Sequence, residues 1–262
     1  MDKKEITSTH EVAPGLCLFI EKLWAEVNIS VGEEGKATVE ISGDEKFLKD
    51  IHVTQPNPKL LQIEGAGSNL QGNSVTVISS GGRGYVSVSS LRGGCIIVGG
   101  GNIVVNGKSI SGDGNVNVIE GGDIPKIKVA VPKGTNLESY DVERVKACGL
   151  KGSLSSHVSG QGSIHASDVN GLKMKCSGQS SCDITAVSGD AKLVTAGQSS
   201  IDIQGDLNEV DADASGQSHI TINGNCHDFE GEASGQSRIL LSGKATGRIR
   251  QRESGQSRVV VH

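Results

Sequence analysis

The tetrapeptide Ser215-Gly216-Gln217-Ser218 is one of six closely similar copies in the second half of the chain. The six glutamines are separated by 18, 19, 19, 19 and 20 residues. A fixed period of this length indicates a solenoid, in which each repeat packs only on its neighbours. The other copies are Ser159-Gly160-Gln161-Gly162, Ser177-Gly178-Gln179-Ser180, Ala196-Gly197-Gln198-Ser199, Ser234-Gly235-Gln236-Ser237 and Ser254-Gly255-Gln256-Ser257.

Apolar residues keep a constant distance from this motif. They occupy the positions six before, four after and six after the motif glycine, and the intervening positions are polar. Such alternation is typical of half-buried strands, here joined by glycine-containing corners. We therefore predict an all-β chain, a single-stranded parallel β-helix with rungs of about 19 residues stacked ~4.8 Å apart. The apolar columns are Leu154, Leu172, Ala191, Val210, Phe229 and Ile249; Ile164, Cys182, Ile201, Ile220, Ile239 and Val259; and Ala166, Ile184, Ile203, Ile222, Leu241 and Val261.

The first half of the chain is less regular. Residues 1–14 are polar and are expected to form a tail, and residues 15–262 a single β-helix domain. A glycine-rich stretch at about 66–123 is expected to be an insertion of irregular β-structure, with Asn106-Gly107 as a hairpin turn. The alternating segments 27–31 and 37–41 predict either a hairpin or the first coils of the stack. Trp24 is expected to cover the end of the stack, where pairing edges would be exposed.

Composition excludes several classes of protein. The net charge of −5 argues against a nucleic-acid partner. No stretch approaches the ~20 apolar residues of a membrane span, and no signal peptide is evident. The six cysteines have no metal-type spacing, so we expect no metal and no cofactor. Cys176 and Cys182 are interpreted as small buried thiols, with disulfides an alternative if the chain is exported.

The stacked glutamines form the main candidate site. They could hold the corners in register as an amide ladder, or they could offer a repetitive polar surface to a ligand such as a glycan. The column two residues further on is variable and should face solvent, with His219 beside Arg238 as a possible binding strip. The surface ladder comprises Gln161, Gln179, Gln198, Gln217, Gln236 and Gln256, and the adjacent column comprises Ser163, Ser181, Ser200, His219, Arg238 and Arg258.

A catalytic alternative rests on two carboxylates. Some β-helices cleave polysaccharides with converging carboxylates or an Asp cluster that binds Ca²⁺. Asp183 and Asp202 occupy equivalent positions on successive rungs, so they could lie ~5 Å apart. The same column continues as Thr221, Leu240 and Val260, and no basic column joins it. We therefore assign no catalytic residue and favour a protein that is not an enzyme.

Charge is unevenly distributed along the repeats. Residues 183–232 hold ten acidic residues and one basic residue, whereas residues 238–258 hold six basic residues and one acidic residue. The simpler interpretation is a set of solvated faces. The alternative is complementary ends that stack head to tail, which would make the protein a self-assembling cytosolic scaffold of the bactofilin type and a homo-oligomer.

The repeats, together with Val39-Glu40-Ile41-Ser42-Gly43-Asp44-Glu45 and the segment 127–132, resemble the family of putative auto-transporter adhesins with a head GIN domain. The glycine-rich stretch departs from that pattern. The resemblance implies a right-handed β-helix, a non-catalytic adhesin-like module with a protein or glycan partner, and a place at the cell surface or outside the cell. The missing signal peptide instead implies a cytoplasmic chain or one whose leader has been removed.

Overall fold

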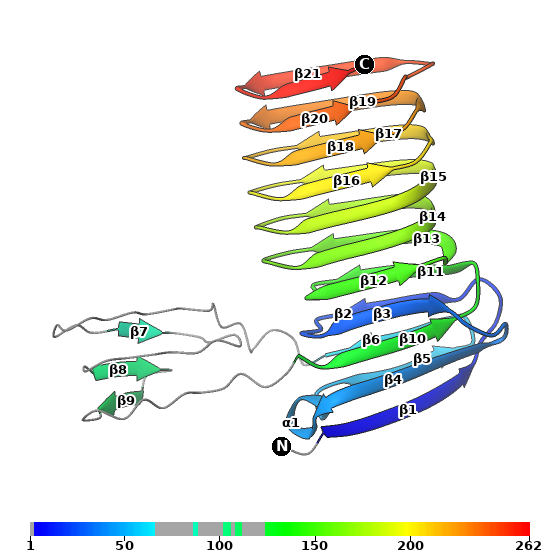
Figure 1. The fold of residues 1–262 in the computed structure, drawn as a ribbon, viewed down its shortest axis with the longest axis vertical. Helices are drawn as coiled ribbons and strands as arrows, with labels where there is room; N and C mark the ends of the chain where they lie inside the picture. The colour runs from blue at the N-terminus through cyan, green and yellow to red at the C-terminus, as the bar shows by residue number, and fades with distance from the viewer. Residues whose placement is uncertain (1–2, 66–85, 89–101, 106–107, 112–123) are drawn as a thin grey trace. The chain divides into compact units, whose positions relative to one another are not determined.

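The computed structural model describes residues 3–65, 86–88, 102–105, 108–111 and 124–262. Contacts divide the chain into two compact units, Met1–Ala66 with Ile124–His262, and Gly67–Asp123. The first unit is a β-solenoid of stacked, mostly parallel strands (Figure 1), so the predicted all-β solenoid is confirmed.

The first unit contains nineteen strands and one short helix among its described residues. In chain order they are β1 (Lys3–Glu11), β2 (Cys17–Glu21), β3 (Glu26–Val31), β4 (Lys36–Asp44), α1 (Glu45–Leu48), β5 (His52–Asn57), β6 (Leu60–Glu64), β10 (Lys126–Val131), β11 (Thr135–Tyr140), β12 (Arg144–Cys148), β13 (Lys151–Val158), β14 (Ser163–Cys176), β15 (Ser181–Thr195), β16 (Ser200–Gln204), β17 (Leu207–Ala214), β18 (His219–Asn223), β19 (Cys226–Gly235), β20 (Arg238–Leu241), β21 (Ile249–Gly255) and β22 (Arg258–Val261).

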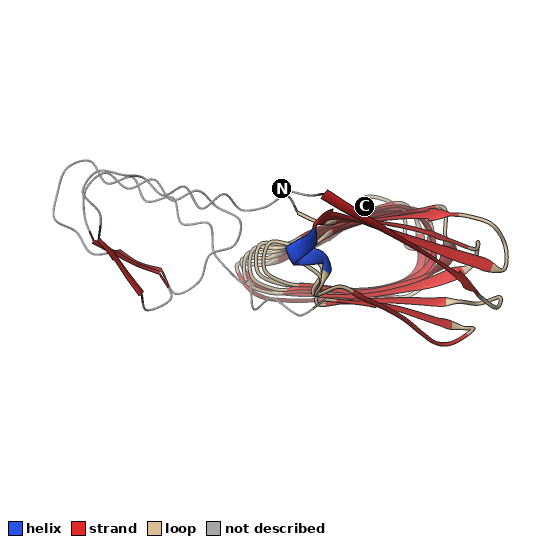
Figure 2. Cartoon of the chain, turned by 90° about the horizontal axis from the view of Figure 1, so that it is seen from below, coloured by secondary structure: helices blue, strands red, loops and turns tan. Residues whose placement is uncertain are grey.

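The strands form two faces that enclose a flat core, as the view along the stack shows (Figure 2). β14 and β15 turn from one face to the other without a break, so each contributes to both. The first face follows the order β1, β4, β10, β3, β12, β14, β15, β16, β18, β20 and β22. The second face follows the order β5, β6, β2, β11, β13, β14, β15, β17, β19 and β21.

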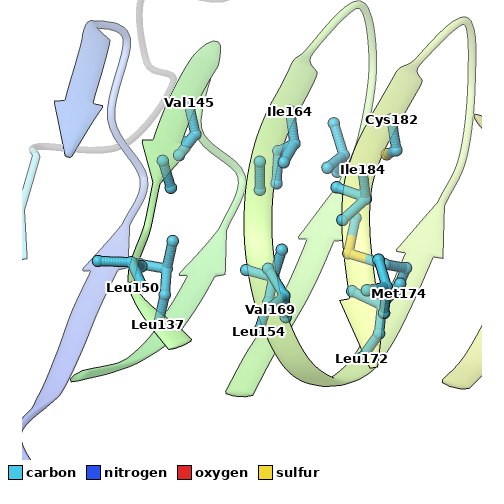
Figure 3. Packing of buried hydrophobic residues seen from close by; sticks show 14 of the residues in the cluster. Leu137, Val145, Leu150, Leu154, Ile164, Val169, Leu172, Met174, Cys182 and Ile184 are labelled. Atoms are coloured by element: carbon cyan, nitrogen blue, oxygen red, sulfur yellow. The ribbon is translucent and has the colours of Figure 1, made fainter. Parts of the chain in front are cut away.

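The core consists of like side chains stacked from rung to rung. Figure 3 shows a row from the first face, Val145, Ile164 and Cys182, opposite a row from the second, Leu137, Leu154 and Leu172. All three predicted columns are buried, except that in the last rung Ile249 is exposed and Val261 partly exposed. The periodic burial of apolar area is the main source of stability for such a stack.

In the first 44 residues the expected tail is wrong, and of the two alternatives for segments 27–31 and 37–41, strands of the stack are found and a hairpin is not. The supposed polar tail contains β1, which pairs antiparallel with β4 along its whole length. β3 and β4 do not form a hairpin, because β10 lies between them, parallel to β3 and antiparallel to β4. The connection at 32–35 therefore spans two strand spacings, ~10 Å, which four residues reach easily.

The two ends of the stack are closed in different ways. At the N-terminal end of the stack lies α1 (Figure 1), and its Phe47 packs edge-on against Trp24, with ring centroids 5.5 Å apart. At the other end, the exposed Gln251 and Glu253 of the last rung occupy the register positions that the buried Gly231 and Ala233 occupy one rung below. The Glu253 carboxylate accepts the Val259 backbone N–H at 2.6 Å. A charged side chain at a sheet edge discourages a further strand from pairing there.

The second unit is described only in three strands, β7 (Val86–Val88), β8 (Asn102–Val105) and β9 (Lys108–Ser111). β7 pairs parallel with β8, and β8 pairs antiparallel with β9. The pairing of Val105 with Lys108 confirms the hairpin predicted at Asn106-Gly107, although these two residues, like most of the 66–123 insertion, lie outside the described part of the chain.

Candidate functional site: the glutamine edge

Each Ser-Gly-Gln-Ser motif forms the corner between a strand of the second face and the next strand of the first. Its glycine has a φ between 67° and 80° in all six copies, a region that favours glycine. Stacking adds a second requirement, since a Cβ on Gly216 would lie 2.9 Å from the carbonyl oxygen of Gly197 in the rung below. Gln217 donates its backbone N–H to the same carbonyl oxygen at 2.7 Å. The motif glycine therefore allows each corner to stack directly on the corner of the rung below.

The last serine of the motif points inward. Ser180, Ser199, Ser218 and Ser237 are all buried. The Ser199 hydroxyl lies 2.8 Å from the Ala196 carbonyl oxygen in its own corner and 3.1 Å from the Cys176 carbonyl oxygen in the rung below. In the corners of Ser199, Ser218 and Ser237, such hydrogen bonds hold the corner shape that aims the neighbouring glutamine side chain outward.

The glutamine side chains are exposed and linked in one continuous ladder. In every step the Nε2 of one glutamine donates to the Oε1 of the next. A side-chain amide has two N–H groups and two oxygen lone pairs, so each internal glutamine keeps one donor and one acceptor for a further contact. The five donor–acceptor distances, from Gln161–Gln179 to Gln236–Gln256, are 3.4, 3.1, 3.2, 3.3 and 3.4 Å.

The column two residues beyond each glutamine lies on the first face directly beside the ladder. We call the two columns together the glutamine edge. Ser163, Ser181 and Ser200 stack in register, with Ser200 donating to the Ser181 hydroxyl at 3.4 Å. The column then changes to His219, Arg238 and Arg258, which are also register partners. The edge is thus neutral and hydroxyl-rich at one end and cationic at the other.

The predicted carboxylate pair is brought together on the first face. Asp183 and Asp202 are register neighbours on β15 and β16. The Nδ1 of His165 lies 3.7 Å from the Asp183 carboxylate, and both side chains are about half exposed. A general acid or base needs a perturbed environment or a convergent partner. No group of three metal-ligating side chains occurs among the described residues.

The acidic and basic segments lie rung on rung within the second face. The guanidinium groups of β21 and of Arg248, the residue before it, contact carboxylates of β19: Arg248 lies 3.2 Å from Asp228 and Arg252 lies 3.6 Å from Glu232. Lys192 contacts Asp211 at 2.7 Å. On the second face the charge asymmetry along the sequence is therefore compensated in part inside one chain, which favours the interpretation of solvated faces over complementary ends.

Two carboxyl groups on this face have opposite pKa shifts. A backbone hydrogen bond from Arg248, together with its guanidinium, lowers the pKa of Asp228. Partial burial raises the pKa of Asp213, and the neighbouring carboxylates of Glu232 and Asp211 raise it further. Asp213 and Glu232 are register partners, and their carboxylates repel each other across the ~4.8 Å rung spacing.

Two of the cysteines are paired, contrary to the interpretation as thiols. Cys176 and Cys182 form a disulfide across the corner that contains Ser180. Both positions face the core, one from each side of the corner, which is why the periodicity suggested only small buried residues. Among the described residues, Cys17, Cys148 and Cys226 are free, and burial raises the pKa of the Cys17 and Cys226 thiols. Cys95 lies outside the described part of the chain.

Stacked repeats of this kind present extended surfaces, which many solenoid proteins use for binding. Residues 169–262 match the family model described as "Putative auto-transporter adhesin, head GIN domain", which confirms the resemblance seen in the repeats. No curated protein matches the chain.

Similar solved structures include two proteins described as a "putative adhesin". One, from Parabacteroides distasonis ATCC 8503, is 13% identical with a TM-score of 0.45, covering 98% of this chain and 97% of that one. The other, from Parabacteroides merdae ATCC 43184, is 10% identical with a TM-score of 0.43, covering 98% and 95%. A "putative lipid binding protein" from P. distasonis is 12% identical with a TM-score of 0.29, covering 94% and 96%. At such identities a likeness says nothing about ligands.

Proposed function

We propose that this protein is a non-catalytic adhesion module that contacts a repetitive polar ligand, a glycan or a protein, through the glutamine edge. The observation that supports this most is the continuous ladder of exposed amides from Gln161 to Gln256. Its free donors and acceptors repeat every ~4.8 Å, so a ligand with regularly spaced hydroxyl or amide groups can make the same contact many times.

The adhesin family model supports the class of function. The disulfide between Cys176 and Cys182 supports an oxidising location such as the cell surface. None of the described helices is long and apolar enough to cross a membrane.

Two variants separate a binding ladder from a purely structural one. Gln198→Ala and Gln217→Ala each remove two amide–amide hydrogen bonds from the middle of the ladder. We expect both to weaken binding in a glycan array or a pull-down with the purified protein. Thr221→Ala on β18, a surface change outside the edge, is the control. Blank arrays and pull-downs with the wild-type protein would count against adhesion. Lower melting temperatures with unchanged binding would leave the ladder a structural role only.

The alternatives have their own tests. An end-to-end scaffold predicts concentration-dependent association at low salt in sedimentation velocity, whereas we expect a species of constant size. A polysaccharide-cleaving enzyme predicts activity that disappears in the double variant Asp183→Ala, Asp202→Ala. Retention of any such activity in that variant would remove the proposed catalytic pair.

A further inference from the structure

The cationic end of the glutamine edge holds two arginines in an arrangement that the fold itself does not need. Arg238 of β20 and Arg258 of β22 are register partners on adjacent parallel strands, with their attachment points about one rung apart. Both are exposed. Among the described residues, neither guanidinium has an ion-pair partner, and His219 occupies the next position of the column. Like charges directly opposite on a sheet are destabilising.

The contrast with the other face of the same rung makes this pair informative. The side chains of Arg250 and Arg252 on β21, and of Arg248 just before it, each lie within 4.0 Å of a carboxylate on β19. The fold therefore has acidic positions available one rung below a row of arginines. On the first face the equivalent neighbours below the arginine pair are His219 and Ser200 instead. The uncompensated charge points to an anionic group supplied from outside.

The surroundings of the pair indicate what carries that group. On one side, Gln236 and Gln256 present side-chain amides. On the other, Leu240 and Val260 lie two residues beyond each arginine, on the same outward side of the sheet, and are partly exposed. An acidic sugar combines hydroxyl groups, an apolar C–H face and a carboxylate or sulfate, so it can use all three kinds of side chain.

We infer that the glutamine edge binds an acidic polysaccharide, whose anionic groups contact Arg238 and Arg258 while its hydroxyl groups continue along the glutamine and serine columns. The inference rests on the proposed adhesive function and names its ligand class. A single-stranded nucleic acid is less suitable, because bases need aromatic stacking platforms. The described aromatic residues lie elsewhere: Phe19 with Tyr140, Trp24 with Phe47, and the buried Phe229.

The test compares two pairs of cations. The double variant Arg238→Ser, Arg258→Ser restores the residue that the same column carries at Ser181 and Ser200. The matched control, Lys173→Ser and Lys175→Ser, removes two exposed lysines from the second face, where no described ion pair involves them. Binding of the intact chain to polygalacturonate, dextran and single-stranded DNA would be measured by calorimetry at two salt concentrations. A single variant, Arg258→Gln on the last strand, serves if the double variant does not fold.

We expect wild type to bind polygalacturonate more tightly than dextran or DNA. The arginine variant should lose about tenfold in affinity, which corresponds to 1.4 kcal/mol, and most of its salt dependence, with no loss of thermal stability. The lysine control should stay within about twofold. Equal losses in both variants, DNA binding as tight as polygalacturonate, or no binding to polygalacturonate would each overturn the inference. Ladder-dependent binding to neutral glycans, unaffected by the arginine variant, would overturn it while leaving the proposed function intact.

Discussion

Replacement of a motif serine by alanine should have different effects on the free energy of unfolding at two equivalent corners. Ser237 Oγ lies 2.8 Å from the Ala214 carbonyl oxygen and 2.9 Å from that of Ser234, and it accepts the Ser234 N–H at 3.2 Å. Ser180 occupies the same corner position three rungs earlier and is equally buried, but its hydroxyl has no hydrogen-bond partner among the described residues.

The expected magnitudes follow from these contacts. A satisfied hydrogen bond contributes about 0.5–1.5 kcal/mol net, so Ser237→Ala, which loses a shared donor and an acceptor, should cost about 1–2 kcal/mol. A buried polar group without a partner carries a desolvation penalty of about 1–3 kcal/mol. Ser180→Ala removes that penalty and should leave stability unchanged or raise it by up to about 1 kcal/mol. The two variants should therefore differ by about 2 kcal/mol.

Urea unfolding followed by far-UV circular dichroism measures this difference, provided that the two variants have equal slopes. Ser199→Ala is the control, because its hydroxyl has carbonyl partners like that of Ser237, and it should resemble Ser237→Ala. If Ser180→Ala costs as much as Ser237→Ala, the serines stabilise the corners by packing, and the hydrogen-bond argument is refuted.

Three further predictions test the ends, the charges and the disulfide. Reducing the Cys176–Cys182 bridge should lower the free energy of unfolding by about 2 kcal/mol through loop entropy, and reductant should not affect the double alanine variant. Asp213→Asn should raise the melting temperature at pH 7, and this gain should fade as the pH falls through the raised pKa of Asp213. Asp228→Asn should lower the melting temperature at pH 7, and this loss should fade as the pH falls from about 4 through the lowered pKa of Asp228. Glu253→Ala should let the last rungs of two molecules pair, so that sedimentation velocity detects association. If the variant stays monomeric, other groups prevent pairing at this end.

The repeats could be predicted from sequence because every repeat reports the same environment. A position that is apolar in five or six equivalent copies, such as the column from Ile164 to Val259, leaves little doubt about its direction. The corners were equally predictable, since glycine recurs where the backbone needs a positive φ and where the rung below leaves no room for a Cβ.

The non-local pairings could not be predicted in the same way. β10 lies between β3 and β4, although it is more than 80 residues further along the chain. The sequence of one strand does not indicate which strands it pairs with. β1 is polar because it lies at the edge of the first face, where charged residues discourage further pairing. Its alternation is too weak to distinguish it from a tail.

The closure of the last rung did leave a signal. Two columns that hold small or apolar residues in the preceding rungs end in Gln251 and Glu253. The position at which a column of small or apolar residues changes to polar or charged ones would therefore have predicted the end of the stack. The disulfide left a weaker signal, because Cys176 and Cys182 replace a threonine or alanine and an isoleucine in their columns without breaking the apolar pattern.

The basic run between residues 238 and 258 shows why position on a face matters more than charge along the chain. The same run supplies β21 on the second face and parts of β20 and β22 on the first. On β21, Arg250 and Arg252 meet carboxylates one rung below and are compensated. On the first face, Arg238 and Arg258 meet each other. The repulsion between Arg238 and Arg258 has a free-energy cost that an external anion could offset, whereas the paired arginines of β21 have no such cost. We therefore expect the ligand at the glutamine edge and not on the more highly charged second face.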